Sequence, residues 1–198
     1  MKKTIFITGA TSGIGKATAE IFAKQGHRLI ICGRRKEVLD NLQIQLSNFT
    51  DVYSLVFDVR NQQEVQNAIN SLPEEWKNID VLVNNAGNAH GLEPISDANI
   101  SDWDAMMDGN VKGLLYVSQP IIKLMKANNS GHIVNISSVA ARQTYANGTV
   151  YCASKKAVDV ISEEMRLELT EFGIKVTNVQ PGAVETDFSK VRFKGDEQ

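Results

Sequence analysis

Short apolar runs alternate along the chain with longer segments in which apolar residues recur at helical spacing. After the first run, residues 4–8, the next segment carries Ile14, Ala17, Ile21 and Phe22 on one helical face. Strands that are apolar almost throughout are typical of a parallel sheet that helices cover on both faces. The pattern predicts strands at 4–8, 28–32, 52–57, 79–83, 133–136 and 175–179, with helices at about 14–25, 35–47, 61–71, 101–127 and 149–171.

This regular alternation of strand and helix predicts a doubly wound α/β domain, the Rossmann fold. A chain of 198 residues fits one domain, and it contains no repeat, no low-complexity segment and no linker rich in Pro or Ser. We therefore expect a single domain over residues 1–198. Ligands of such sheets bind outside the carboxyl ends of the strands, so the segments after each strand are the candidates for chemistry.

Composition and charge exclude several classes of function. The net charge of −2 gives no electrostatic basis for binding nucleic acid or an anionic membrane. The longest apolar runs are far shorter than the roughly 20 residues of a membrane span, and the N-terminus does not read as a secretory signal. Two cysteines, Cys32 and Cys152, form no disulfide framework and predict a reduced, cytoplasmic chain. Three scattered histidines show no metal-ligand spacing, so we expect no metal.

A glycine-rich stretch, TGATSGIG at 8–15, lies between the first predicted strand and the first predicted helix. Glycines permit a tight turn and a close ligand approach, and the start of a helix presents free N–H groups to an anion. The spacing differs from the commoner G-x-G-x-x-G, and a tight turn without a ligand is the alternative. Its place after the first strand favours a phosphate site, with Gly9, Thr11, Ser12, Gly13, Ile14 and Gly15 as the candidate contacts.

Two arginines, Arg34 and Arg35, follow the second predicted strand. An acidic residue at this position would bind the 2′-hydroxyl of NAD, whereas arginine accommodates the 2′-phosphate of NADP. The alternative is a solvated pair of charges, but cations at the start of a helix oppose its dipole and so need another reason. The sequence therefore favours NADP, with both arginines as phosphate contacts.

Polar residues also follow the third and fourth predicted strands. Asp58, beside Val59, could accept a hydrogen bond from an adenine amino group or could cap the next helix. The stretch NNAG at 84–87 lies near the expected switch point of the sheet, although it could also be a polar turn that satisfies its own backbone. Asn110 is polar within an apolar helical region, which indicates a kink or a cap. The cofactor contacts predicted here are Asp58, Val59, Asn85, Ala86 and Gly87.

Tyr151 and Lys155 are four residues apart, so on a helix their side chains share one face. A positive charge beside a phenol favours the phenolate, and such a pair can transfer protons near neutral pH. A chance pair on a solvated helix is the alternative. Ser138, thirteen residues before Tyr151, could donate a hydrogen bond to a substrate carbonyl oxygen. No histidine or acid lies near Ser138 in a triad-like context, which argues against hydrolysis.

Together these motifs resemble the short-chain dehydrogenase/reductase family in its classical form. The matches are TGATSGIG (8–15), NNAG (84–87), NVKG (110–113), the serine at 138, YCASK (151–155) and the Pro-Gly pair at 181–182 followed by Thr186. They occur in the family's order over nearly the whole chain. In addition GRR, PEEW (73–76) and FSKVRFKGD (188–196) resemble a bacterial NADP-dependent subgroup that oxidises serine, allo-threonine and related 3-hydroxy acids.

The resemblance implies roles for individual residues. Tyr151 would be the catalytic acid/base, and Lys155 would lower its pKa and hold the ribose hydroxyls of the cofactor. Ser138 would orient the reacting oxygen, and Asn110 would maintain a helix kink and a water that links Lys155 to solvent. The resemblance also implies the strand order 3-2-1-4-5-6, and nicotinamide contacts from Pro181, Gly182, Val184 and Thr186.

The expected function is hydride transfer between NADP(H) and a small hydroxy compound, such as serine, allo-threonine or 3-hydroxypropionate. The alternatives are an NADPH-dependent carbonyl reductase of another substrate class and a non-catalytic dinucleotide-binding redox sensor. A sensor would be expected to have lost Ser138, Tyr151 or Lys155, and all three are present. An epimerase or dehydratase on the same fold is disfavoured by the glycine spacing.

Two further expectations concern the extent and the assembly of the protein. Members of the family usually run further and add a helical substrate lid and a seventh strand, so we expect this chain to be incomplete at its C-terminus. The family also implies a homotetramer or a dimer packed through long helices. Ala153, Ala157 and Val160, on the other side of the Tyr151 helix, are small enough to admit a neighbouring helix, and burial in the chain's own core is the alternative.

Overall fold

One parallel sheet forms the centre of the molecule in the computed structural model, which describes residues 2–186. Its strands are β1 (Thr4–Ile7), β2 (Arg28–Gly33), β3 (Val52–Val56), β4 (Val81–Asn84), β5 (Gly131–Ile136) and β6 (Ile174–Val179). They pair in the order β3-β2-β1-β4-β5-β6, and every pairing is parallel. The predicted fold and strand order are confirmed.

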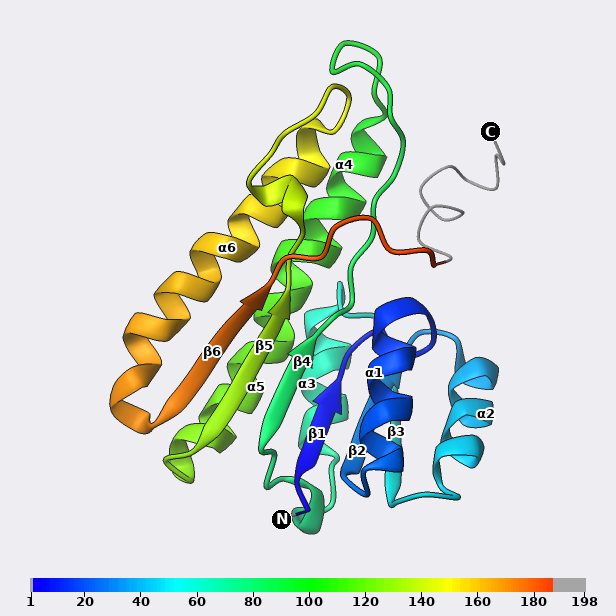
Figure 1. The fold of residues 1–198 in the computed structure, drawn as a ribbon, viewed down its shortest axis with the longest axis vertical. Helices are drawn as coiled ribbons and strands as arrows, with labels where there is room; N and C mark the ends of the chain where they lie inside the picture. Colours follow the sequence, from blue (N-terminus) through cyan, green and yellow to red (C-terminus); the bar gives the residue numbers. More distant parts are fainter. Residues whose placement is uncertain (1, 187–198) are drawn as a thin grey trace.

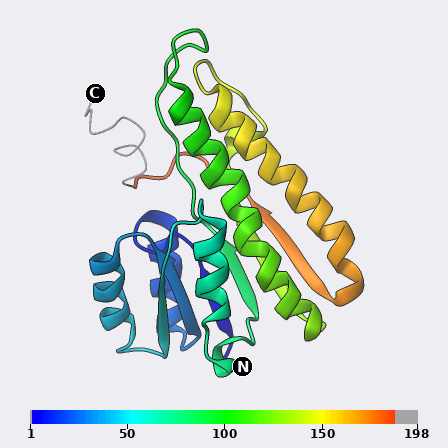
Figure 2. The same ribbon diagram turned by 180° about the vertical axis from the view of Figure 1, so that it is seen from behind.

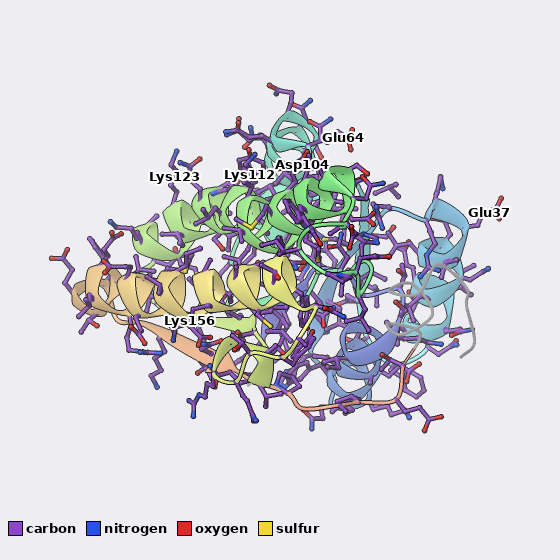
Figure 3. All side chains as sticks on the ribbon, turned by 90° about the horizontal axis from the view of Figure 1, so that it is seen from above. Glu37, Glu64, Asp104, Lys112, Lys123 and Lys156 are labelled. Atoms are coloured by element: carbon purple, nitrogen blue, oxygen red, sulfur yellow. The ribbon has the colours of Figure 1, made fainter. Side chains whose placement is uncertain are left out.

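Helices cover both faces of the sheet (Figures 1 and 2). Two of them, α1 (Gly13–Lys24) and α2 (Lys36–Leu46), pack over β1, β2 and β3 on one face. The other face carries α3 (Gln62–Asn70), α5 (Gly113–Ala127) and α6 (Thr149–Leu169), with α4 (Ile100–Met107) leading into α5. Seen from above, α5 and α6 lie side by side (Figure 3). The five predicted helical regions are confirmed within a few residues at each end.

The central strands β1, β2 and β4 are largely apolar because each one contributes to two separate cores. Successive residues of a strand point to opposite faces. Phe6 and Ile30 therefore belong to the core under α3, α5 and α6, whereas Ile5, Ile7 and Ile31 belong to the core under α1 and α2. All five are at most 1% exposed. Burial on both sides fixes the register of the sheet, which aligns the carboxyl ends of β1, β4 and β5 at one edge.

The long helical region predicted over 101–127 is interrupted where the sequence indicated a kink. A π-helical segment, Asp108–Lys112, joins α4 to α5 and contains Asn110. Such segments arise where one residue too many is accommodated in a helix, and they are frequent at functional sites. The Asn110 side chain is only 2% exposed, so the interruption turns it into the protein.

The interpretation of Asp58 as a helix cap is wrong. Asn61 occupies the N-cap position of α3, and its side chain accepts hydrogen bonds from the backbone N–H groups of Gln63 and Glu64. Asn is a favoured residue at this position because its oxygen satisfies N–H groups that have no partner within the helix. Asp58 lies three residues before this N-cap position, so its carboxylate does not cap α3.

The outer face of α6 is not buried against the chain itself. Ala153 is exposed, Ala157 is half-buried and Val160 is 49% exposed. The alternative that these residues belong to the chain's own core is therefore wrong for Ala153 and Val160. In the part of the chain that the structure describes, no helix is both long enough and apolar enough to cross a membrane, and no cluster of potential metal ligands is found.

Candidate active site

The glycine-rich loop turns sharply between β1 and α1. Gly9 and Gly13 have φ angles of 64° and 52°, a backbone region that side chains other than glycine rarely adopt. Ser12 stands at the N-cap of α1 but makes no side-chain cap hydrogen bond. The first N–H groups of α1 therefore lack the usual side-chain partner, which is the arrangement that accepts an anion.

Asn85, at the end of β4, holds this loop in place. Its side-chain amide donates to the backbone oxygens of Thr8 and Gly9, at 3.0 and 3.1 Å. In return, the Thr8 hydroxyl accepts from the backbone N–H groups of Asn85 and Ala86. A Cβ atom on Gly15 would lie 2.4 Å from both the Asn85 amide and the Gly9 oxygen, so the close approach requires glycine there. The sequence motif at 84–87 thus has a structural task, and the direct cofactor contacts predicted for Asn85 and Ala86 stay predictions.

The two arginines after β2 lie beside the glycine loop. The Arg35 guanidinium donates to the Thr11 hydroxyl at 3.1 Å, and Arg34 lies 3.6 Å from the Asp58 carboxylate. Gly33 permits this proximity, because a Cβ atom there would lie 2.8 Å from the Thr11 methyl group. Positive charge therefore gathers where the strand ends meet the loop.

Asp58 is held by Arg60 as well as by Arg34. Arg60 donates to both oxygens of the carboxylate, from Nε to Oδ1 at 3.1 Å and from Nη2 to Oδ2 at 2.6 Å. Partial burial raises the pKa of Asp58, but the hydrogen bonds and the charge of Arg60 outweigh it, so the pKa lies below its ordinary value. Val59 packs against Gly113 at the start of α5. The carboxylate is thus ionised and fixed at the edge where an adenine ring is predicted.

Tyr151 lies in the first turn of α6, and Lys155 lies one turn later. The Lys155 ammonium is 6.0 Å from the centre of the Tyr151 ring and donates to the Ile136 backbone oxygen at 3.0 Å. Lys155 is only 6% exposed, and burial lowers its pKa from 10.5 to about 8. The structure therefore places a buried cation beside the phenol, at the end of β5.

Ser138 starts the short helical turn Val139–Ala141, which contacts α6. It is 9% exposed, and its hydroxyl oxygen accepts from the Ala140 N–H group at 3.1 Å. The hydroxyl hydrogen can therefore point to another acceptor, because a hydroxyl group donates as well as accepts.

Asn110 joins the π-helical segment to the residues around Lys155. Its amide oxygen accepts from the backbone N–H of Asn88 at 2.7 Å, and its amide nitrogen donates to the backbone oxygen of Asn88 and to the Ser154 hydroxyl. A Cβ atom on Gly87 would lie 3.0 Å from the Asn110 amide oxygen and 3.4 Å from the Lys155 ammonium. Asn110, Gly87 and Lys155 therefore converge, and the water that the resemblance implies between Asn110 and Lys155 stays a prediction. The sequence did not single out the partners Asn88 and Ser154, although Ser154 lies within the YCASK stretch.

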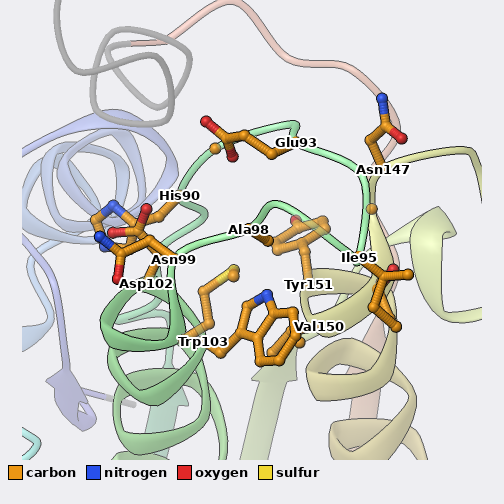
Figure 4. A pocket seen from close by; sticks show the side chains of 14 residues that line it. His90, Glu93, Ile95, Ala98, Asn99, Asp102, Trp103, Asn147, Val150 and Tyr151 are labelled. Atoms are coloured by element: carbon orange, nitrogen blue, oxygen red, sulfur yellow. The ribbon is translucent and has the colours of Figure 1, made fainter.

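A pocket opens beside Tyr151 (Figure 4). Trp103 and Met106 of α4 line one side, and His90 and Glu93 come from the segment between β4 and α4. Because Tyr151 borders this pocket, a small molecule in it would lie next to the phenol. Sequence reasoning did not identify these lining residues, since they share no spacing that distinguishes them from ordinary loop and helix positions.

The segment after β6 returns across the carboxyl ends of the strands (Figure 1). The Pro181 backbone oxygen accepts from the Val139 N–H at 3.0 Å. A Cβ atom on Gly13 would lie 3.4 Å from the Thr186 side chain, so this segment reaches the glycine loop. Gly182 is exposed and Val184 is 50% exposed. The stretch FSKVRFKGD at 188–196 lies outside the described residues.

These features fit a dinucleotide with a 2′-phosphate. The start of α1 offers a site for phosphate groups, and the two arginines lie where the adenylate half of the cofactor would bind. The segment 181–186 faces the glycine loop. Tyr151 and Lys155 lie at the opposite end, near β5. The predicted contacts therefore gather along one edge of the sheet.

Comparisons with known proteins agree with this geometry. The family model for short chain dehydrogenases matches residues 3–197. The NADP-dependent 3-hydroxy acid dehydrogenase YdfG of Escherichia coli is 44% identical over 194 residues, which cover 98% of this chain and 77% of the relative. Sulfoacetaldehyde reductase 2 of Chromohalobacter salexigens is 41% identical, and the match covers 100% of this chain and 79% of the relative.

Solved structures show the same likeness. A serine dehydrogenase in its closed form, complexed with NADP⁺, has a TM-score of 0.93 and 44% identity, covering 98% of this chain and 78% of that one. A short-chain dehydrogenase from Sphingobium yanoikuyae in complex with NADPH has a TM-score of 0.86 and 31% identity, and the match covers 94% of this chain and 73% of that one. The chain therefore belongs to the short-chain dehydrogenase family.

Proposed function

We propose that this protein is an NADP(H)-dependent oxidoreductase that interconverts a small 3-hydroxy acid and the corresponding carbonyl compound. The observation that carries this proposal is the buried Lys155 ammonium beside Tyr151, at the far end of a sheet edge that begins with the glycine loop and two arginines. One end of this edge suits a phosphorylated adenylate, and the other end holds a proton-transfer pair.

The residues that would hold the cofactor divide into two groups. The N–H groups at the start of α1 would face the phosphates, and Arg34 and Arg35 would bind the 2′-phosphate. Pro181 and Thr186 would border the nicotinamide half. The bound cofactor supplies the hydride acceptor or donor, which protein side chains cannot provide.

Tyr151 would exchange the proton of the substrate hydroxyl group. An ammonium group beside a phenol stabilises the phenolate, and the buried position of Lys155 strengthens this effect because little water screens the charge. Ser138 would donate its hydroxyl hydrogen to the reacting oxygen. Asn110 would keep the Asn88 backbone and Ser154 in place around Lys155.

The substrate class is supported by the relatives. The 44% identical relative is named for 3-hydroxy acids, and the solved relative for serine. The likeness to a sulfoacetaldehyde reductase supports a second candidate, NADPH-dependent reduction of a small aldehyde that carries a sulfonate. In both substrate types one carbon separates the reacting carbon from an acid group, so the two candidates differ in the acid group and in the direction of reaction.

We also propose that the enzyme acts in the cytoplasm as a homotetramer or dimer. The exposed Ala153 and Val160 on α6 support an assembly in which α6 packs against a second copy. Light scattering would measure the mass of the assembly, and a monomer at micromolar concentration would contradict this part.

The substrate proposal is tested by NADP⁺ reduction with L-serine, L-allo-threonine, 3-hydroxyisobutyrate and 3-hydroxypropionate, beside NADPH oxidation with sulfoacetaldehyde and a panel of ketones. We expect turnover with at least one hydroxy acid and a preference for NADP⁺ over NAD⁺. Turnover only with sulfoacetaldehyde or a ketone would favour the carbonyl reductase. Binding of NADP⁺ without turnover of any compound would favour a redox sensor.

A further inference from the structure

A buried carboxylate, Asp159, lies one turn after Lys155 on α6. The residue is 6% exposed, and its side chain accepts three hydrogen bonds. The Ser137 hydroxyl donates to one oxygen at 2.8 Å, the Asn178 amide donates to the same oxygen at 2.7 Å, and the Gln180 amide donates to the other oxygen at 2.8 Å. Both oxygens are therefore engaged.

These hydrogen bonds keep the buried acid charged. Burial raises the pKa of Asp159, but the hydrogen bonds from Gln180, Asn178 and Ser137 outweigh it, and the pKa lies below its ordinary value. Lys156 occupies an exposed position on α6 (Figure 3), and its ammonium group lies 3.9 Å from the Asp159 carboxylate, which makes it a weak additional partner. A buried charge is costly unless donors surround it, and an apolar residue would fill the same space without that cost. The carboxylate therefore has a task beyond packing.

The three donors come from the ends of two strands. Ser137 directly precedes Ser138 at the end of β5, and its hydroxyl also lies 3.0 Å from the Lys155 backbone oxygen. Asn178 lies in β6, and Gln180 directly precedes Pro181. The Ser137 N–H donates to the Val179 backbone oxygen at 2.8 Å, which ties the two strand ends to each other.

We propose that Asp159 is a positioning residue that fixes two active-site segments against the helix that carries Tyr151 and Lys155. Through Ser137 it sets the place of Ser138, and through Gln180 it sets the place of Pro181 and Gly182. The contacts of Asp159 involve α6, β5 and β6, whereas Thr11 and Arg35 follow β1 and β2. Asp159 therefore governs how the nicotinamide half of the cofactor is held and leaves the adenylate half unaffected. This inference rests on the proposed cofactor site.

The test compares two ligands on the Asp159→Asn variant of the full chain by isothermal titration calorimetry. NADP⁺ reports on both halves of the site, and 2′,5′-ADP reports on the adenylate half alone. The substitution keeps the volume but replaces the charged carboxylate with a neutral amide that has only one acceptor oxygen, so the hydrogen bonds that Asp159 accepts are weakened. We expect NADP⁺ to bind about tenfold more weakly while the affinity for 2′,5′-ADP stays within about twofold.

Matched variants separate positioning from general damage to the fold. Gln180→Met removes one donor and should produce the same difference between the two ligands, with a smaller loss for NADP⁺. This variant also serves if Asp159→Asn fails to fold. Lys156→Ala removes the weak partner and should leave both affinities unchanged.

The outcomes distinguish this inference from the proposed function. Equal losses for the two ligands, or no loss for either, in the Asp159 and Gln180 variants would overturn the positioning role while the cofactor site stands. A wild-type chain that binds neither ligand would refute the cofactor site and this inference together.

Discussion

Replacing Lys155 with Met should stabilise the protein near neutral pH while it removes the activity. Burial lowers the pKa of Lys155 from 10.5 to about 8, so the folded chain disfavours the charged form that it holds below that pH. At about 1.4 kcal/mol per pKa unit, this difference corresponds to about 3 kcal/mol. Met has a similar length and no charge, so it avoids this cost.

One favourable contact is lost in the same substitution. The Lys155 ammonium donates to the Ile136 backbone oxygen at 3.0 Å. Losing such a hydrogen bond costs about 1 kcal/mol, which leaves a net gain of about 2 kcal/mol at pH 7. For a domain of this size, that gain corresponds to a rise in Tm of roughly 4 to 8 °C.

The gain should disappear as the pH rises. Below about pH 8 the lysine is charged in both the folded and the unfolded chain, and the full cost of burying the charge is present. Above 10.5 it is neutral in both, and that cost is absent. Between these values the wild type therefore becomes more stable relative to Lys155→Met, and the order of the two proteins should reverse near the upper end.

The assay is thermal or urea unfolding of both proteins without cofactor, at several pH values from 7 to 10. Lys156→Met is the matched control, because Lys156 neighbours Lys155 but its side chain is 62% exposed. The difference in stability between Lys156→Met and wild type should not change over this pH range. A Lys155→Met protein that is less stable than wild type at pH 7, or a stability difference that does not vary with pH, would contradict the cost assigned to burying this charge.

Three other substitutions test separate parts of the account. Arg34→Ala should lower the preference for NADPH over NADH by about tenfold or more, because one cation for the 2′-phosphate is lost, and an unchanged ratio of kcat/KM values would remove this assignment. Asn110→Leu breaks hydrogen bonds to Asn88 and Ser154, so both turnover and Tm should fall, and full turnover in the variant would contradict the role of the π-helical segment. Asn61→Ala removes the cap of α3 and should cost about 1 kcal/mol of stability in urea unfolding without altering kinetics, and a change in kcat would show that the cap has a functional role.

The parallel sheet could be predicted because burial on both faces leaves a direct mark on the sequence, whereas its strand order was implied by the family resemblance. Strands such as β1 are continuously apolar since Phe6 faces one core while Ile5 and Ile7 face the other. The interruption at Asn110 was also visible, since a polar residue inside an apolar helix needs a local reason. Exact helix ends were less well predicted, and Asp58 was a plausible cap only because Asn61 had not been recognised as a better one.

The tasks of several site residues could not be read from spacing. Asn85 was predicted as a cofactor contact, and the structure shows that its amide holds the backbone of the glycine loop. Asp159 follows the motif of Tyr151 and Lys155 by one helical turn and looks like an ordinary polar residue of a surface helix. Its role depends on Asn178 and Gln180, which are brought to it only by the pairing of β5 with β6.

The most direct test of the account is the Tyr151→Phe variant, measured beside wild type for NADP⁺ binding and for turnover of the best hydroxy acid. The substitution removes one hydroxyl group from a ring that borders the pocket and leaves the glycine loop, the arginines and Lys155 unchanged. We expect an NADP⁺ affinity within about twofold of wild type and a kcat reduced by about 100-fold or more, because general acid–base catalysis contributes that much. Turnover in the variant equal to that of wild type would contradict the proposed mechanism.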